Sequence, residues 1–208
     1  MITNKHPATR NLHVVYTIVV VLCIAIALFI LQALNLVFPE NEQYQIGTPI
    51  DSLNHVIVYY NGETSNVTAR NISKEGYNIG LKWQCVEFVK RYYYEHFNHV
   101  MPFPGGNAKD IFDHNLPDAS YNEKRGLVQY SNPSLKKPAI DDIIVFDGHI
   151  GNKYGHIGII SNVYENNIEI ISQNAGPDSP SREELRLVFV NGKWKVMNRR
   201  VLGWMRIE

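Results

Sequence analysis

The sequence lacks a surplus of charge of either sign, and it lacks any long basic run. Its 208 residues carry 20 Lys and Arg against 20 Asp and Glu, which gives a formal net charge of zero. No run of Lys or Arg is longer than two residues. Proteins that follow a nucleic-acid backbone present clustered basic side chains to it. The composition therefore excludes nucleic acid as an expected partner.

Cysteine is also scarce, since the chain holds only Cys23 and Cys85. There is no Cys-x-x-Cys pair, and a metal site built from His96, His99 and Cys85 lacks a recognisable ligand spacing. Cys23 lies inside a long apolar run, so the rest of the chain offers Cys85 no partner for an intramolecular disulfide. We expect no structural disulfide, no bound metal and no other cofactor.

One long segment carries no charge at all. Residues 14–38 (VVYTIVVVLCIAIALFILQALNLVF) are almost entirely apolar. As a helix they would cover roughly 37 Å, which exceeds the bilayer core of about 30 Å. A cleaved signal peptide is the alternative, but its apolar region is usually about 7 to 15 residues long and a small-x-small cleavage site should follow. We therefore expect a transmembrane anchor at residues 14–38.

The flanking charges indicate how this anchor is oriented. Lys5 and Arg10 precede the apolar run, and after it no Lys or Arg occurs before Arg70. The positive-inside rule then predicts a single-pass protein with a cytoplasmic tail at residues 1–13. Residues 39–54 form a tether leading into an extracytoplasmic domain at 55–208. The sequence does not indicate an oligomeric state.

The residues of the exported part predict a helix followed by an antiparallel sheet, an α+β plan. In residues 83–97 (WQCVEFVKRYYYEHF), apolar side chains recur at helical spacing, and Glu87 and Arg91 form a pair four residues apart on the expected outward side. The Pro- and Gly-rich stretch 98–138 reads as loop, with a short helical candidate at 108–114. Strands are expected at residues 55–60, 140–147, 156–164, 168–174, 185–190, 194–198 and 201–207, with Asn191-Gly192 as a hairpin turn.

Cys85 lies in the first turn of the predicted helix, where free backbone N–H groups favour a thiolate. We therefore expect the thiol pKa to be lowered. An unpaired thiol in an oxidising compartment suggests catalysis, although a buried, inert cysteine is the alternative. A nucleophilic thiol needs a base, and of the eight histidines His149 and His156 lie at the edge of the predicted sheet. His156 opens a rigid strand whereas His149 lies in a Gly-containing loop, so His156 is favoured.

A catalytic imidazole also needs a third group that orients it. The neighbouring strand ends in Ser172, Gln173 and Asn174. A register slip of one residue would exchange Gln173 for Ser172 and Asn174 on the face shared with His156, so the register stays open. Asn174 is the preferred orienting residue, with Ser172 at the other candidate position.

Four segments together resemble the CHAP family, the cysteine- and histidine-dependent amidohydrolases and peptidases. They are WQCVEFVKR around Cys85, YGHIGII around His156, the QN at 173–174 and the terminal VLGWM at 201–205. The likeness runs from about residue 46 to 208. Within the family, the chain most resembles the amidase domain of bifunctional glutathionylspermidine synthetase/amidases. It implies a papain-like α+β fold, attack of Cys85 on an amide carbonyl to give a thioester, and His156 as base and then acid.

The resemblance also implies that Gln84 and Lys90, on either side of Cys85, contact the substrate. Two departures stand out. Ser172 occupies the position where that amidase has a Glu, so no negative charge stabilises the imidazolium there, and Lys90 replaces an Arg. The synthetase domain has no counterpart, so we expect no ATP-dependent ligation.

We therefore expect thiol-dependent hydrolysis of an amide bond, in a glutathionylspermidine-like γ-glutamyl peptide amide or in a peptidoglycan peptide. Motif similarity favours the first substrate and an outward-facing domain favours the second. The alternative is a membrane-anchored CHAP-fold module that binds a peptide with weak or no catalysis. Ser172 at the Glu position supports that alternative.

Overall fold

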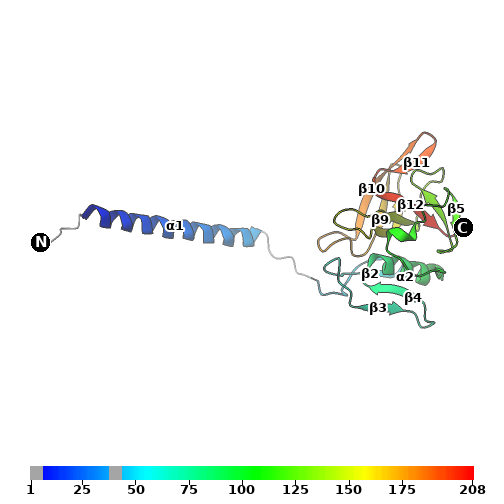
Figure 1. Ribbon diagram of the computed structural model, residues 1–208, viewed down its shortest axis with the longest axis horizontal. Coiled ribbons are helices and arrows are strands. Elements are labelled where there is room, and N and C mark those ends of the chain that lie inside the picture. Colours follow the sequence, from blue (N-terminus) through cyan, green and yellow to red (C-terminus); the bar gives the residue numbers. More distant parts are fainter. Residues whose placement is uncertain (1–6, 38–43) are drawn as a thin grey trace. The chain divides into compact units, whose positions relative to one another are not determined.

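The computed structural model describes residues 7–37 and 44–208, with side chains of the first helix described at 14–30 and 32. The chain divides into two compact units, Met1–Gln43 and Tyr44–Glu208 (Figure 1). The described residues of the first unit, 7–37, form one helix. The second contains the sheets and the helix that carries Cys85.

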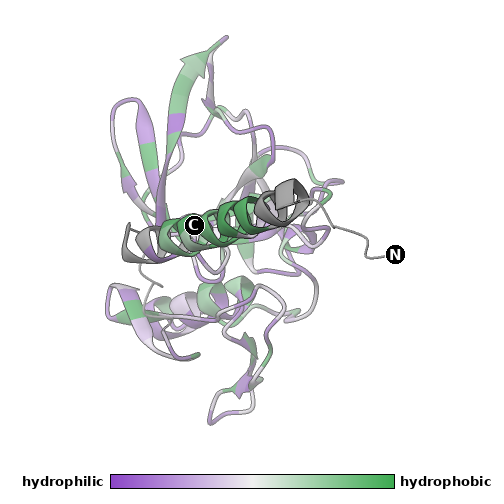
Figure 2. Cartoon of the chain, turned by 90° about the vertical axis from the view of Figure 1, so that its left-hand side faces the viewer, coloured by the Kyte–Doolittle hydropathy of each residue, from purple (hydrophilic) through white to green (hydrophobic). Residues whose placement is uncertain are grey.

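Helix α1 spans Pro7–Val37 and is 31 residues long. Its described apolar side chains are exposed from Val14 to Ile30, and Figure 2 colours this part as hydrophobic. Over the described residues, no helix meets the combined requirements of length and apolar character for crossing a membrane. Phe38 of the expected anchor, residues 1–6 of the expected tail and residues 39–43 of the expected tether lie outside the described residues.

The second unit begins with two small antiparallel hairpins: β1 (Pro49–Leu53) with β2 (Val56–Tyr59), and β3 (Ala69–Ile72) with β4 (Asn78–Lys82). Asn54 and His55 join the first pair with φ of 46° and 68°, as a two-residue turn of this kind requires. The strand expected at 55–60 is present as β2. Strand β1 was not predicted and lies inside the stretch expected to be a tether.

Helix α2 spans Cys85–Phe97, so the expected helix is confirmed with Cys85 as its first residue. Phe88, Val89 and Tyr92 are fully buried. The helix ends at Asn98, whose left-handed backbone (φ 52°) lets its N–H donate to the Tyr93 carbonyl.

An eight-stranded antiparallel sheet makes up most of the unit, in the order β11-β10-β9-β8-β7-β12-β6-β5. Its strands are β5 (Ser120–Asn122), β6 (Leu127–Ser131), β7 (Ile143–Phe146), β8 (His156–Val163), β9 (Asn167–Ile171), β10 (Arg182–Val190), β11 (Lys193–Val196) and β12 (Val201–Arg206). Asn191 and Gly192 turn the chain between β10 and β11, as predicted. The prediction that residues 98–138 are loop is wrong in one respect, because this stretch contains β5 and β6. The helical candidate at 108–114 is a short 3-10 turn, η1 (Lys109–Ile111).

Alternate residues of the sheet enter two different cores. Along β7, Ile143 and Val145 join the cluster that contains Cys85 and the buried face of α2. Ile144 and Phe146 join a second cluster on the opposite side. Helix α2 thus packs on one face of the sheet, and the α+β plan is as expected.

Candidate functional site

The Cys85 sulfur lies where α2 begins and β8 begins. Cys85 is 9% exposed, and the backbone N–H groups of Cys85, Val86 and Ile157 lie near enough to its sulfur to favour the thiolate. The first two belong to the first turn of the helix. Ile157 directly follows His156 along β8. The structure therefore brings the start of the helix against the start of the strand that carries the predicted base.

The expectation that the helix lowers the thiol pKa is wrong for this structure. The three N–H groups favour the thiolate, but burial opposes it more strongly and raises the pKa of the Cys85 thiol to about 11. The sulfur is thus a neutral thiol at neutral pH.

His156 is the first residue of β8 and follows Gly155. Gly155 has a φ of 77°, and a Cβ built on it would lie 2.4 Å from the Phe146 carbonyl oxygen, so only glycine fits there. The His156 ring lies 6.2 Å from the Phe146 ring. Burial, together with nearby Arg200, lowers the pKa of His156 to about 4. The imidazole is therefore neutral at neutral pH, like the thiol.

Within the described part of the chain, no hydrogen bond fixes the His156 imidazole. Its Nε2 atom is buried and has no partner among the described residues. Of the hydrogen bonds that the described residues make, none joins His156 to Cys85. Catalytic hydrogen bonds are often long or misaligned until substrate binds. The structure thus places the two residues at adjoining element ends without forming their hydrogen bond.

Asn174 lies just beyond β9 and has a left-handed backbone with φ of 61°. Its Nδ2 donates to the Gln84 side-chain oxygen at 2.8 Å and to the Thr64 carbonyl at 3.0 Å. Its Oδ1 is buried and unpartnered among the described residues. The β8–β9 register pairs Ile159 with Ile171. That pair is the last at this end of the ladder, and Asn174 lies beyond it.

Ser172 is buried, 5% exposed, and its backbone N–H donates to the Ser181 carbonyl at 2.8 Å. A Cβ built on Gly158 would lie 3.2 Å from the Ser172 Cβ, so these two residues lie side by side on the same face. Ser172 and Asn174 together line a small hollow of about 20 Å³ beside Tyr59. The hollow is about the size of one water molecule.

The side chain of Gln84 is held by the protein itself. Its Nε2 donates to the carbonyls of Asn66 (2.8 Å) and Thr64 (3.1 Å), while its oxygen accepts from Asn174. Gln84 and Asn174 therefore form one polar cluster next to Cys85. This cluster joins Gln84, the residue before Cys85, to the residues that follow β9.

Lys90, the other expected substrate contact, is only 1% exposed. Its ammonium donates to the carbonyls of Asn78 and Pro104 and lies 4.8 Å from the centre of the Tyr77 ring. Burial lowers its pKa to about 8. The ammonium joins α2 to its neighbours, and this geometry lends no support to a contact with substrate.

A buried polar network beside the site was not predicted from the sequence. Glu87 is fully buried and accepts from Arg91 Nε at 2.7 Å, Asn71 Nδ2 at 2.7 Å and Gln173 Nε2 at 3.0 Å. The expectation that Glu87 and Arg91 face outward is wrong, because the β3–β4 hairpin covers that side of the helix. Gly80 of β4 permits this contact, since a Cβ there would lie 3.0 Å from the Glu87 Cα. The only sequence signal was the spacing of four residues.

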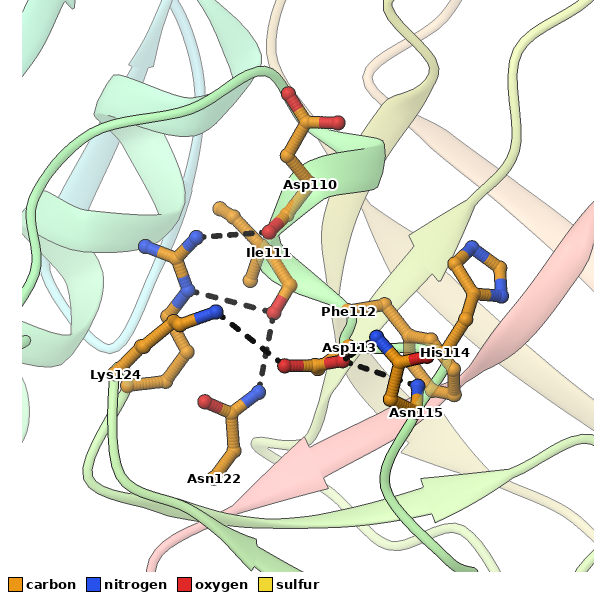
Figure 3. A pocket seen from close by; sticks show the side chains of 9 residues that line it. Asp110, Ile111, Phe112, Asp113, His114, Asn115, Asn122 and Lys124 are labelled. Atoms are coloured by element: carbon orange, nitrogen blue, oxygen red, sulfur yellow. Dashed lines mark hydrogen bonds and ion pairs between the residues drawn. The ribbon is translucent and has the colours of Figure 1, made fainter.

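A larger hollow, of about 250 Å³, lies elsewhere in the unit (Figure 3). Its walls are Asp110, Ile111, Phe112, Asp113, His114, Asn115, Asn122, Lys124 and Arg125. None of the predicted site residues lines it. Across residues 7–37 and 44–208, no group of three or more His, Cys, Asp or Glu side chains is placed to hold a metal ion.

Comparison with known proteins shows that residues 76–174 match the CHAP domain family, a range that contains Cys85, His156 and Asn174. Trypanothione synthetase from Crithidia fasciculata is 24% identical over 147 residues, which are 69% of this chain and 22% of that protein. Bifunctional glutathionylspermidine synthetase/amidase from Escherichia coli is 28% identical over 138 residues, 61% of this chain and 22% of that protein. The match thus spans about a fifth of the length of these curated relatives. A solved structure, "The crystal structure of Ly7917", has a TM-score of 0.37 and 18% identity over 59% of this chain and 52% of that chain.

Proposed function

We propose that this chain, whose residues 76–174 form a CHAP domain, hydrolyses an amide bond with Cys85 as nucleophile. The family and the amidase among its relatives support a cysteine hydrolase acting on amides. The observation that carries the assignment is the proximity of the Cys85 thiol to the Ile157 backbone N–H within one buried cluster, because Ile157 directly follows His156. We name Cys85 and His156 as the reacting pair.

The reaction starts from a neutral pair. With a thiol pKa of about 11 and an imidazole pKa of about 4, neither group is ionised at pH 7. The sulfur attacks the carbonyl carbon as its proton passes to His156. The tetrahedral intermediate then expels the amine, which takes that proton and leaves a thioester on Cys85. Water, deprotonated by the neutral imidazole, adds to the thioester and releases the acid and the free thiol.

The helix start supplies the groups that stabilise the oxyanion. The N–H groups of Cys85 and Val86 lie beside the thiol in the first turn of α2, where no earlier helical turn supplies them with a carbonyl partner. Backbone donors held rigidly in this way stabilise the charge that develops on the carbonyl oxygen. They also explain why the nucleophile occupies the first position of a helix.

Asn174 is the residue we propose to orient His156. The unpartnered Oδ1 of Asn174 is an acceptor and the unpartnered Nε2 of His156 becomes a donor in the matching tautomer. In our proposal these two atoms pair during the reaction, and the same tautomer leaves Nδ1 of His156 to accept the thiol proton. Asn174 is neutral, as is Ser172, so the imidazolium is stabilised less than beside a carboxylate.

Two amides are candidate substrates. The name of the bifunctional relative supports a glutathionylspermidine-like γ-glutamyl amide. A position outside the membrane supports a peptidoglycan peptide. The experiment is to incubate the chain with glutathionylspermidine and with purified muropeptides, and to follow released amines by mass spectrometry.

We expect amine release from one of the two, and loss of at least about a thousandfold in Cys85→Ala. Cys23→Ala is the matched control and should keep full activity, because it removes the other thiol. Unchanged release by Cys85→Ala would contradict the proposal. Binding of a peptide without release would favour the alternative, a CHAP-fold binding module.

We also propose that residues 14–38 anchor the chain in a membrane, with residues 44–208 outside the cytoplasm. The support is the uncharged sequence of this run and the exposure of its apolar side chains from Val14 to Ile30. Lys5 and Arg10 before the run support the orientation.

A further inference from the structure

Gln173 lies between Ser172 and Asn174, is fully buried, and connects three parts of the fold. Its Oε1 accepts from the backbone N–H of Tyr59 in β2 at 2.8 Å and from Arg91 Nη2 at 3.5 Å. Its Nε2 donates to Glu87 Oε2 at 3.0 Å and to the Gln84 carbonyl at 3.2 Å. One amide thus contacts β2, the buried ion pair of α2 and the residue that precedes Cys85.

The hydrogen bond from Gln173 to the Gln84 carbonyl lies at the N-terminal end of α2. Gln84 is the N-cap of α2, and its side chain makes no capping hydrogen bond to the helix. The start of the helix is instead held from outside, by Gln173 on the carbonyl and by Asn174 on the side chain of Gln84. Both contacts come from the end of β9, which lies beside β8 and His156.

Arg91 and Glu87 hold the Gln173 side chain in one orientation. Both side chains are buried, and the Arg91 Nε and Glu87 Oε1 atoms lie 2.7 Å apart. Glu87 accepts hydrogen bonds from the side chains of Asn71, Arg91 and Gln173, and a carboxylate acceptor requires the Gln173 amide to present its nitrogen. A fully connected network of this kind fixes the geometry of the residues it touches.

We propose that Gln173 is a positioning residue that fixes where the first turn of α2 lies against β8, and so keeps the Cys85 sulfur buried beside Ile157. The inference rests on the proposed function for its catalytic meaning, since the position matters there for the approach to His156. The position and burial of the Cys85 sulfur can be tested without measuring catalysis. Without the Gln173 amide the first turn of α2 loosens and water reaches the sulfur, so the burial that raises the thiol pKa is relieved.

Gln129 provides a matched control within the same unit. It is also a fully buried glutamine, and it makes side-chain hydrogen bonds to Asp113 and Asn122, away from Cys85. Gln173→Met and Gln129→Met both replace a buried amide by an unbranched apolar chain of similar size. The two variants remove comparable networks, but only one of these touches the start of α2.

The experiment measures iodoacetamide alkylation of Cys85 between pH 7 and 10 in the full chain, with Cys23→Ser in every variant so that one thiol remains. We expect Gln173→Met to shift the alkylation profile to lower pH and to raise the rate at pH 8 at least about tenfold, because the thiol is better solvated. Gln129→Met should keep the parental profile. Gln173→Asn, whose amide is one methylene shorter, serves if Gln173→Met does not fold, and should shift the profile in the same direction.

Amide hydrolysis is measured on the same proteins. We expect kcat to fall in Gln173→Met while KM changes little, because the nucleophile and not the binding surface is displaced. An alkylation profile identical to that of the parent in a folded Gln173 variant would overturn the positioning role. If no protein in the set, including the parent, cleaves an amide, the proposed function fails, and the alkylation profiles still decide the role of Gln173.

Discussion

At the scale of single residues, Cys85 shows two opposing effects on one thiol. The backbone N–H groups of Cys85, Val86 and Ile157 stabilise the thiolate, whereas the closed packing around the sulfur destabilises it. Burial has the larger effect in the ligand-free state. The sequence revealed the first effect through the position of Cys85 in a helix. It could not reveal the second, which depends on side chains from β8 that lie about seventy residues away along the chain.

The raised thiol pKa predicts how Cys85 reacts with pH. Only the thiolate is alkylated, and a thiol pKa of about 11 leaves its fraction rising through the whole range below it. The alkylation rate with iodoacetamide should therefore increase about tenfold for each pH unit from 7 to 10. A rate that levels off below pH 8 would show instead that the thiol is ionised at neutral pH.

The lowered pKa of His156 predicts a loss of stability in acid. Its folded-state pKa of about 4 lies below the ordinary value of 6.5, so the unfolded chain binds a proton that the folded chain does not. The unfolding free energy should fall as the pH drops from about 6.5 to 4, by up to about 3 kcal/mol. Chemical unfolding followed by tryptophan fluorescence measures this.

His156→Gln is the control for this loss, and its stability should depend less on pH in the same window. Asp142 acts in the opposite sense, because burial raises its pKa to about 7 and the folded state binds its proton more tightly. Because Asp142 is present in both proteins, the difference between their pH dependences of unfolding free energy reports the contribution of His156. Equal slopes in the two proteins would contradict the assignment.

At the scale of elements, α2 is covered on more sides than its sequence indicates. Periodicity identified the helix and its apolar face, and Asn191-Gly192 identified the β10–β11 turn, because both signals are local. Strands β5 and β6 were missed because they lie among prolines and glycines. They form by pairing, β6 with the distant strand β12 and β5 with β6, which the local sequence does not indicate. The burial of Glu87 and Arg91 was missed because the covering hairpin, β3–β4, has mostly exposed or half-buried residues and no strong strand pattern.

The buried Glu87–Arg91 pair predicts a large effect of removing one partner. Arg91→Met leaves the Glu87 carboxylate buried without its cation, which typically costs about 3 to 5 kcal/mol of unfolding free energy. Lys124→Met breaks the exposed pair with Asp113 and should cost less than about 1 kcal/mol. Urea unfolding of the two variants makes the comparison. Similar small losses in both would show that Glu87 is not held as a buried charge.

At the scale of the whole molecule, the chain contains two units with different compositions. The apolar run in α1 was evident from the sequence, as was the α+β order of the second unit. The choice among Ser172, Gln173 and Asn174 was not, since these residues follow the last pair of the β8–β9 ladder, Ile159 with Ile171, and their placement depends on contacts with distant parts of the chain. The four segments that resemble the CHAP family fall on α2, β8, the end of β9 and β12, which lie far apart in the sequence.

The proposed anchor predicts that membrane association depends on the first unit alone. The full chain should sediment with membranes after a sodium carbonate wash, because residues 14–38 would be buried in lipid. A chain that starts at Tyr44 should remain in the supernatant and show the same cooperative unfolding of its sheet. The proposed anchor would be wrong if the full chain were also extracted by carbonate.

The central claim is that the Cys85 sulfur forms a covalent bond with the acyl group of the substrate. The most direct measurement is the intact mass of the protein after acid quenching during turnover, with peptide mapping of any adduct. We predict a transient acyl adduct on the Cys85 peptide that hydroxylamine removes, and no adduct in Cys85→Ala. Amine release at full rate with no adduct on Cys85 at any time would contradict it.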